Sequence, residues 1–240
     1  MNFRYFFFLL FSFCCFAQKN HYKVVYEQKK LATEFGVSIP STVKTYLEGD
    51  GKNSIYIEDW THVNNEETNN IFSIKSEKNP AFFKDLNNKT IIYSTHIRLK
   101  PFDLKDEIAG FNWNIKSETK NILGYNCQKA TTVHRGRTFT VYFAQEIPFA
   151  DGPWKLFGLP GLILDVKLES SLGSLTISAV NVEIKENSNE IVNPFVDKKI
   201  IGYDEFVKIY NKKNEEMLSQ QAEGSTLRLS DGFMEILLKK

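Results

Sequence analysis

The feature that most constrains this chain is a run of turns that ends in a strand, from Glu146 to Glu169 (EIPFADGPWKLFGLPGLILDVKLE). Proline lacks the backbone donor that a central strand needs, so the Ile147-Pro148 and Gly152-Pro153 steps predict a shaped connection between strands. Pro160 and Gly161 suit the two central positions of a type II turn, which predicts a positive φ at Gly161. The chain must therefore reverse direction here.

A half-buried strand follows this reversal. One predicted face carries Leu162, Leu164, Val166 and Leu168, and the other carries Ile163, Asp165 and Lys167. This two-residue period is typical of a strand with one covered face. The preceding segment, Trp154 to Leu159, is apolar, and we expect it to pack against the open end of a sheet. Contact with a ligand is the alternative for these side chains.

Other segments also predict antiparallel strands. Residues 42–48 and 54–60 flank a Gly-Asp-Gly turn, and residues 124–134 and 137–145 flank Arg135-Gly136, so each pair predicts a hairpin. In the strand that begins at Leu175, the apolar phase switches, which predicts a β-bulge near Ala179 or a strand covered on both sides.

The apolar period changes near the C-terminus. From Tyr203 it becomes that of an amphipathic helix, closing near Gly224, and residues 226–238 read as an edge strand. The whole pattern predicts a mainly β fold: a curved antiparallel sheet, half-barrel-like, with a C-terminal amphipathic helix. We expect this helix and the Trp154 to Leu159 loop to cover the concave side.

Residues 1–17 have the pattern of a secretory signal peptide. The segment has one charge, at Arg4, followed by an apolar run and the small residue Ala17. It is shorter than the about 20 apolar residues of a transmembrane helix. We expect its removal, which leaves residues 18–240 as a single β domain, exported to the periplasm, the outer membrane or the cell exterior. The alternative is a lipid-anchored protein that is acylated at Cys14 or Cys15.

The composition of the remaining chain excludes some partners. Removing Arg4 lowers Lys+Arg from 30 to 29, which equals the 29 Asp+Glu, so the net charge is zero. Such a chain does not attract nucleic acid or an anionic membrane by bulk charge. We expect no transmembrane segment after signal removal. Cys127 is then the remaining cysteine, which predicts no intrachain disulfide and a thiol packed in the sheet.

One hexamer and several upstream signatures occur together. The hexamer is Gly158-Leu159-Pro160-Gly161-Leu162-Ile163, and before it stand Trp113, residues 124–131 (GYNCQKAT) and Asp151-Gly152-Pro153. In this order they resemble the GLPGLI family of exported Bacteroidetes proteins, with a departure at Tyr142, where that family more often carries Trp. The resemblance implies a cell-envelope location and a mainly β domain of unknown function, with no activity to transfer.

No catalytic signature stands in the sequence: there is no His-Glu-x-x-His, Gly-x-Ser-x-Gly, Cys-x-x-Cys or phosphate-binding glycine loop. Cys127 and His134 would lie about 23 Å apart, on opposite faces of one regular strand. Asp103, Asp106 and Glu107 are candidate cation ligands without a template spacing. We therefore predict no catalytic residues, no metal site, no cofactor and a protein that is not an enzyme.

The function predicted from these features is non-enzymatic. We expect an exported binding or carrier protein for a lipid or other hydrophobic small molecule, by analogy with curved sheets that hold such ligands. The candidate ligand contacts are Trp113, Tyr142, Trp154 and Phe157. The alternative is a structural or accessory domain that docks on an outer-membrane protein partner. No nucleic acid is expected as a partner.

Overall fold

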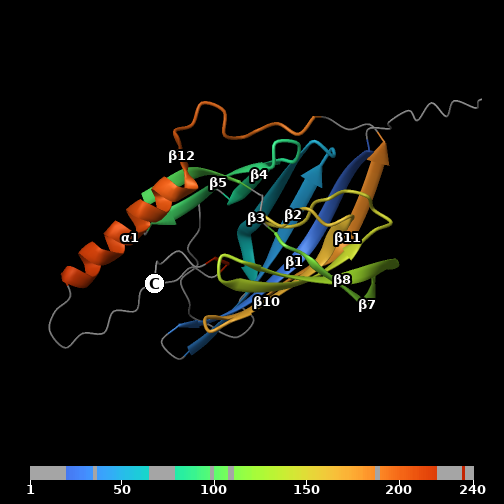
Figure 1. Cartoon of the computed structure of the whole chain (residues 1–240), viewed down its shortest axis with the longest axis horizontal. Coiled ribbons are helices and arrows are strands. Elements are labelled where there is room, and N and C mark those ends of the chain that lie inside the picture. The colour runs from blue at the N-terminus through green and yellow to red at the C-terminus, as the bar shows by residue number, and fades with distance from the viewer. Residues whose placement is uncertain are drawn as a thin grey trace, which may run out of the picture.

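The computed structural model describes residues 20–34, 37–64, 79–97, 100–107, 111–186, 190–220 and 234–235. Within these ranges, twelve strands form one curved sheet and a helix follows (Figure 1). The elements are β1 (Asn20–Glu34), β2 (Val37–Gly49), β3 (Asn53–Asn64), β4 (Ala81–Asp85), β5 (Thr90–Ile97), β6 (Lys100–Glu107), β7 (Asn114–Ile122), β8 (Tyr125–His134), β9 (Arg137–Ala144), β10 (Leu162–Ser170), β11 (Gly173–Glu186), β12 (Ile200–Gly202) and α1 (Tyr203–Ser219). The predicted fold class, mainly β with a C-terminal helix, is confirmed.

The strands run across the sheet in the order β12-β6-β5-β4-β3-β2-β1-β11-β10-β9-β8-β7. Neighbours pair antiparallel, except that β12 runs parallel to β6. The sheet thus has two meanders, β1 to β6 and β7 to β11, which are joined where the long strands β1 and β11 pair. This joint brings residues from the two halves of the chain onto one concave surface.

The turn between β8 and β9 and a β-bulge in β11 agree with the sequence predictions. At the β8–β9 turn, Arg135 and Gly136 have φ of 44° and 76°, as a two-residue type I′ turn requires. The bulge predicted near Ala179 is present, because the pairing of β1 with β11 passes from Val25–Asn181 to Tyr26–Ala179 and leaves one residue unpaired.

The reversal at Pro160-Gly161 differs from the prediction. Gly161 is absent from the glycines with positive φ, and its N–H donates to the Leu159 carbonyl at 2.8 Å, a three-residue turn around Pro160. The glycine is needed for close approach, because a Cβ at Gly161 would lie 2.2 Å from the Ala144 carbonyl oxygen. In the connection before β10, positive φ values are found instead at Trp154, at 55°, and at Gly158, at 95°.

The strand after this turn is β10, as predicted, but the assignment of Ile163 to its more polar face is wrong. Ile163, predicted beside Asp165 on the more polar side, is fully buried. A register shift between Ile163 and Asp165 in the pairing with β9 is the reason, since the extra residue changes which side chains point inward.

The core lies on the concave face, where the segment between β9 and β10 folds back onto the sheet. Trp154, Leu156 and Leu159 from this segment are buried, which confirms the expected packing of the loop. Side chains of β1 secure it: Tyr22 donates to the Asp151 carboxylate at 2.6 Å, and Tyr26 donates to the Ile163 carbonyl at 2.8 Å. A smaller cluster of Phe83, Ile191 and Phe195 forms a second buried group.

Helix α1 begins where β12 ends and extends away from the sheet edge (Figure 1). Phe206 anchors it by packing edge-on against Phe102 of β6, with ring centroids 5.7 Å apart. Asp204 and Glu205 stand in the first turn, where the helix dipole favours negative charge. Among the described helices none has the length and apolar character to cross a membrane. The predicted signal peptide and most of the predicted edge strand 226–238 lie outside the described residues.

Candidate functional site

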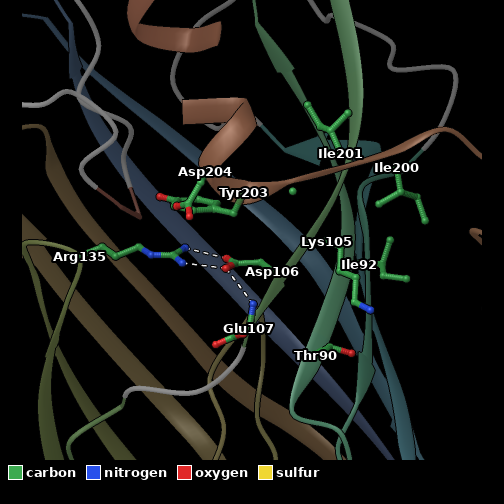
Figure 2. Close-up of a pocket in the computed structure, with 11 residues that line it drawn as sticks. Thr90, Ile92, Lys105, Asp106, Glu107, Arg135, Ile200, Ile201, Tyr203 and Asp204 are labelled. Carbon is green, nitrogen blue, oxygen red and sulfur yellow. Dashed lines mark hydrogen bonds and ion pairs between the residues drawn. The ribbon is translucent and has the colours of Figure 1, made fainter. Parts of the chain in front are cut away.

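A cleft of about 910 Å³ opens at the edge of the sheet, where the chain passes from β12 into α1. It forms there because β12 pairs with β6 only from Asp103 to Lys105, so that the last residues of β6 run on beyond the added strand. The lining residues, drawn in Figure 2, come from β5, β6, the β8–β9 turn, β12 and the start of α1: Thr90, Ile92, Lys105, Asp106, Glu107, Arg135, Ile200, Ile201, Gly202, Tyr203 and Asp204.

An ion pair between Asp106 and Arg135 stands in this lining (Figure 2). The two guanidinium nitrogens of Arg135 donate to the two carboxylate oxygens of Asp106, at 2.7 and 2.8 Å, in the bidentate geometry that fixes both planes. The guanidinium carbon also lies 3.5 Å from the centroid of the Tyr203 ring. The type I′ turn holds Arg135 at the tip of a hairpin, from which its side chain reaches β6.

Behind Asp106 lies a buried cation, Lys155, whose side chain is 3% exposed. A tight turn presents it, closed by the Leu156 N–H to the Pro153 carbonyl at 3.2 Å, with Trp154 at a φ of 55°, a strained value for a bulky residue. The ammonium group donates to Asp106 at 3.2 Å and to the Tyr93 hydroxyl at 2.8 Å.

Glu235 supplies the second carboxylate of this cluster from a distant part of the chain. Both of its oxygens lie 2.9 Å from the Lys155 ammonium, and Oε1 also accepts from Arg135 at 2.8 Å. His134 Nε2 lies 3.6 Å from the same oxygen. We name the set Lys155, Arg135, Asp106 and Glu235 the ion cluster; its two cations balance its two anions.

The environment keeps Glu235 ionised. Burial alone would raise the pKa of this carboxyl, but Lys155, the hydrogen bond from His134 and Arg135 together lower it to about 2. Burial lowers the pKa of Lys155, while Glu235 and Asp106 oppose that change. A permanently charged carboxylate accepts hydrogen bonds, and a guanidinium donates them. Of the ion cluster, Asp106 and Arg135 line the cleft, so a carboxylate that accepts hydrogen bonds and a guanidinium that donates them are available to a ligand there.

A second buried ion pair lies elsewhere on the concave face and is closed to solvent. The Lys84 ammonium donates to the Asp151 carboxylate and, at 2.5 Å, to the Gly152 carbonyl, and both charged side chains are 0% exposed. Because this pair ties β4 to the segment between β9 and β10, its geometry is that of a structural link.

The four predicted ligand contacts do not form one site. Trp113 and Phe157 meet, since the indole N–H donates to the Phe157 carbonyl at 2.9 Å. Trp154 is buried, 5% exposed, and stacks on Phe139 with centroids 5.6 Å apart. Tyr142 lies on the other face of β9, where the Lys120 ammonium is 5.4 Å from its ring centroid.

The ion cluster was not identified as a unit in the sequence. The sequence marks Asp106 only as a candidate cation ligand, and within the described residues no group of three or more His, Cys, Asp or Glu is placed to hold a metal. The sequence places Arg135 only as a residue of a hairpin turn. One local signal was present, because Lys155 interrupts an otherwise apolar loop, and a lysine that folds into a core needs a carboxylate partner.

Residues 87–206, half of the chain, match the family model described as "N-glycanase peptide, N-terminal domain". Two solved structures of PNGF-II are similar, in space groups P21 and C2. The P21 structure has a TM-score of 0.54 and 17% sequence identity, and the match covers 80% of this chain and 33% of the PNGF-II chain. The C2 structure has a TM-score of 0.50 and 18% identity, and the match covers 89% of this chain and 37% of the PNGF-II chain. This chain therefore spans about a third of the length of PNGF-II. A comparison with curated proteins finds no match.

These findings correct one prediction. The sequence led us to expect that the chain is not an enzyme, and this expectation is wrong, because the family model that matches belongs to N-glycanases. The absence of short catalytic signatures misled us, since such signatures identify only a few local arrangements of catalytic groups. The comparisons do not test the resemblance to the GLPGLI family, which stays a prediction.

Proposed function

This chain belongs to the family of N-glycanase N-terminal domains, and we propose that it binds N-linked glycans in the cleft and so contributes to N-glycanase activity. The observation that carries the proposal is the cleft itself, about 910 Å³ in volume, with the Asp106–Arg135 pair in its lining. The similar PNGF-II structures support the fold, and family membership supports the class of substrate.

The lining of the cleft suits a sugar. Exposed Glu107 and Asp204 are acceptors for sugar hydroxyl groups, and Lys105 is a donor. The half-buried Tyr203 ring and the isoleucines of β5 and β12 offer apolar surface for the C–H faces of a pyranose ring. Donors, acceptors and apolar surface thus occur side by side, as recognition of a neutral glycan needs.

A lipid or other hydrophobic ligand fits this cleft less well. Charged groups without a partner on the ligand would be desolvated by an acyl chain, which costs free energy. The carrier role predicted from the sequence, and docking on an outer-membrane partner, remain separate predictions. Titration of the protein with a long-chain fatty acid tests the first of them.

Isothermal titration with an N-glycopeptide, the same peptide without its glycan, and the free glycan tests the proposal. We expect heat from the glycopeptide and the glycan, and none from the bare peptide. Replacing Lys105 or Asp204 by Ala removes an exposed cleft contact, and we expect at least about a fivefold weaker glycan affinity, equivalent to about 1 kcal/mol.

Lys167 provides the matched control, because this lysine is 57% exposed on β10 and lies outside the cleft lining. Lys167→Ala is expected to bind glycan as the unchanged protein does. In parallel, the release of glycan from a glycoprotein is followed by the mobility shift of that glycoprotein on a gel. If no glycan binds, or if the Lys105 and Lys167 variants lose affinity equally, the cleft is not the glycan site.

Export to the cell envelope is also part of the proposal. It rests on the signal-peptide pattern of residues 1–17. Cell fractionation with sequencing of the mature N-terminus tests it: a terminus at Gln18 supports cleavage after Ala17, and an acylated Cys14 or Cys15 supports the lipid-anchored alternative.

A further inference from the structure

Arg135, which lines the cleft, also takes part in a buried internal contact that glycan binding does not require. Glu235 is 7% exposed, and its carboxylate receives Lys155 on both oxygens and Arg135 on one. Its sequence separations from these partners are 80 and 100 residues. The contact therefore attaches the short segment Met234–Glu235 to Arg135, which lines the cleft.

The positive charges of Lys155 and Arg135 explain why the Glu235 carboxylate is bound between them. Without Glu235, the buried Lys155 and the partly buried Arg135 would face only one anion, Asp106, which leaves one positive charge in excess. Burying an unbalanced charge is unfavourable, so the position demands an anion. The centroids of the Tyr93 and Tyr203 rings lie 4.1 and 5.3 Å from the Lys155 ammonium, so aromatic rings as well as carboxylates surround this cation.

We propose that Lys155 and Arg135 form a binding site for a single carboxylate, which Glu235 occupies in this chain and for which a carboxylate-bearing ligand in the cleft competes. Arg135 connects the two, because it lines the cleft and binds Glu235 at once. An acidic sugar that displaces Glu235 would also release Met234, which packs against the core beside it. The inference does not depend on the binding of neutral glycans.

The test is rescue by a small carboxylate. Glu235→Ala empties the site, and we expect its melting temperature in sodium chloride to fall by about 6 °C or more, because a buried charge is left unpaired. Sodium acetate at the same ionic strength supplies the missing carboxylate. We expect acetate to raise the melting temperature of this variant by about 3 °C or more relative to chloride, and to leave the unchanged protein unaffected.

The control is the double variant Glu235→Ala with Lys155→Met, which should not respond to acetate. N-acetylneuraminic acid in place of acetate then asks whether a sugar carboxylate enters the same site. Equal melting temperatures of Glu235→Ala in acetate and chloride would overturn the proposal.

A second measurement covers the case in which Glu235→Ala does not fold. Met234 packs against the core next to Glu235, so its methyl resonance reports whether the segment is attached. In the isosteric Glu235→Gln we expect this resonance to move towards that of an unfolded chain. An unchanged resonance would show that the charge does not hold the segment, and the carboxylate site would be rejected. Glycan titration of the same protein is a separate measurement, so failure of one proposal does not imply failure of the other.

Discussion

Replacing Lys84 by Met should destabilise the fold severely, because it leaves Asp151 as a buried, uncompensated carboxylate. Both side chains are 0% exposed, and Lys84 also donates to the Gly152 carbonyl at 2.5 Å. Tyr22, which donates to Asp151 at 2.6 Å, is the hydrogen-bond partner that the carboxylate keeps. Methionine has nearly the volume of lysine, so the change removes charge and hydrogen bonds rather than packing.

The expected loss follows from the burial of this pair. Removing one partner of a buried ion pair costs about 3 to 5 kcal/mol. For a chain of this length each kcal/mol shifts the melting temperature by about 2 to 4 °C, so Lys84→Met should melt about 6 to 20 °C lower. Such a loss is a large fraction of the about 5 to 15 kcal/mol that holds a typical domain folded.

Chemical denaturation followed by circular dichroism measures this loss, and hydrogen exchange locates it. The amides of Gly158 and Ile163 donate to Ala150 and Asp151 within the segment that Lys84 ties down, at 3.2 and 3.0 Å. These amides should exchange faster in Lys84→Met than amides elsewhere in the sheet. Local release of the segment, and not only global unfolding, is therefore expected.

Two further variants decide whether charge is the cause. Lys120→Met breaks an exposed pair, Lys120–Asp165 at 3.0 Å, and should cost less than about 1 kcal/mol. Combining Lys84→Met with Asp151→Asn leaves no buried charge, so the double variant should be more stable than Lys84→Met alone. The reasoning is refuted if Lys84→Met loses no more than Lys120→Met, or if the double variant loses the sum of its two single losses.

Three other predictions concern acid, a glycine and a thiol. The pKa of Glu235 is lowered to about 2, and this shift contributes roughly 3 kcal/mol of stability at pH values above the unfolded pKa of about 4.5. When the free energy of unfolding is measured against pH, this contribution should be lost as the pH falls from about 4.5 towards 2. Glu235→Gln should remove that part of the pH dependence. Gly161→Ala, whose Cβ would meet the Ala144 carbonyl, should lose about 1 to 3 kcal/mol in thermal melts, whereas Gly202→Ala has open space and should lose less than about 1. Burial raises the pKa of Cys127 to about 11, so peptide mapping should find its thiol unlabelled in the native protein and labelled after unfolding.

The sequence predicted those parts of the fold that local patterns control. Alternation of apolar residues located strands such as β10 and β11, and the phase switch near Ala179 located a bulge, because both depend on which side of a strand each residue faces. The short strand β4 (Ala81–Asp85) was not predicted, since five residues give too little alternation to separate a strand from a loop. The order of strands across the sheet also lay beyond local patterns, because β1 pairs with β11 from the far end of the chain.

The candidate site could be predicted only in fragments. Asp106, Arg135, Lys155 and Glu235 meet across separations of 29 to 100 residues, so no spacing along the chain reveals the cluster. Each residue alone fitted an ordinary role, as a strand carboxylate, a turn residue or a loop lysine. The aromatic residues chosen as ligand contacts were conspicuous in the sequence, but burial in the core accounts for Trp154 without a ligand.

The two buried lysines differ in role, because one ion pair only stabilises the fold and the other adjoins the cleft. Lys84 and Lys155 both donate to carboxylates inside the concave face, and burial lowers the pKa of each. They differ in what surrounds the pair: the Lys84 pair is fully enclosed, so a ligand could reach it only by unfolding the segment above it. The Lys155 pair adjoins Arg135, whose side chain is 24% exposed at the cleft. Perturbed charges mark a functional site only where a ligand can touch them, so the cluster at the cleft, and not the enclosed pair, is the place to look for binding.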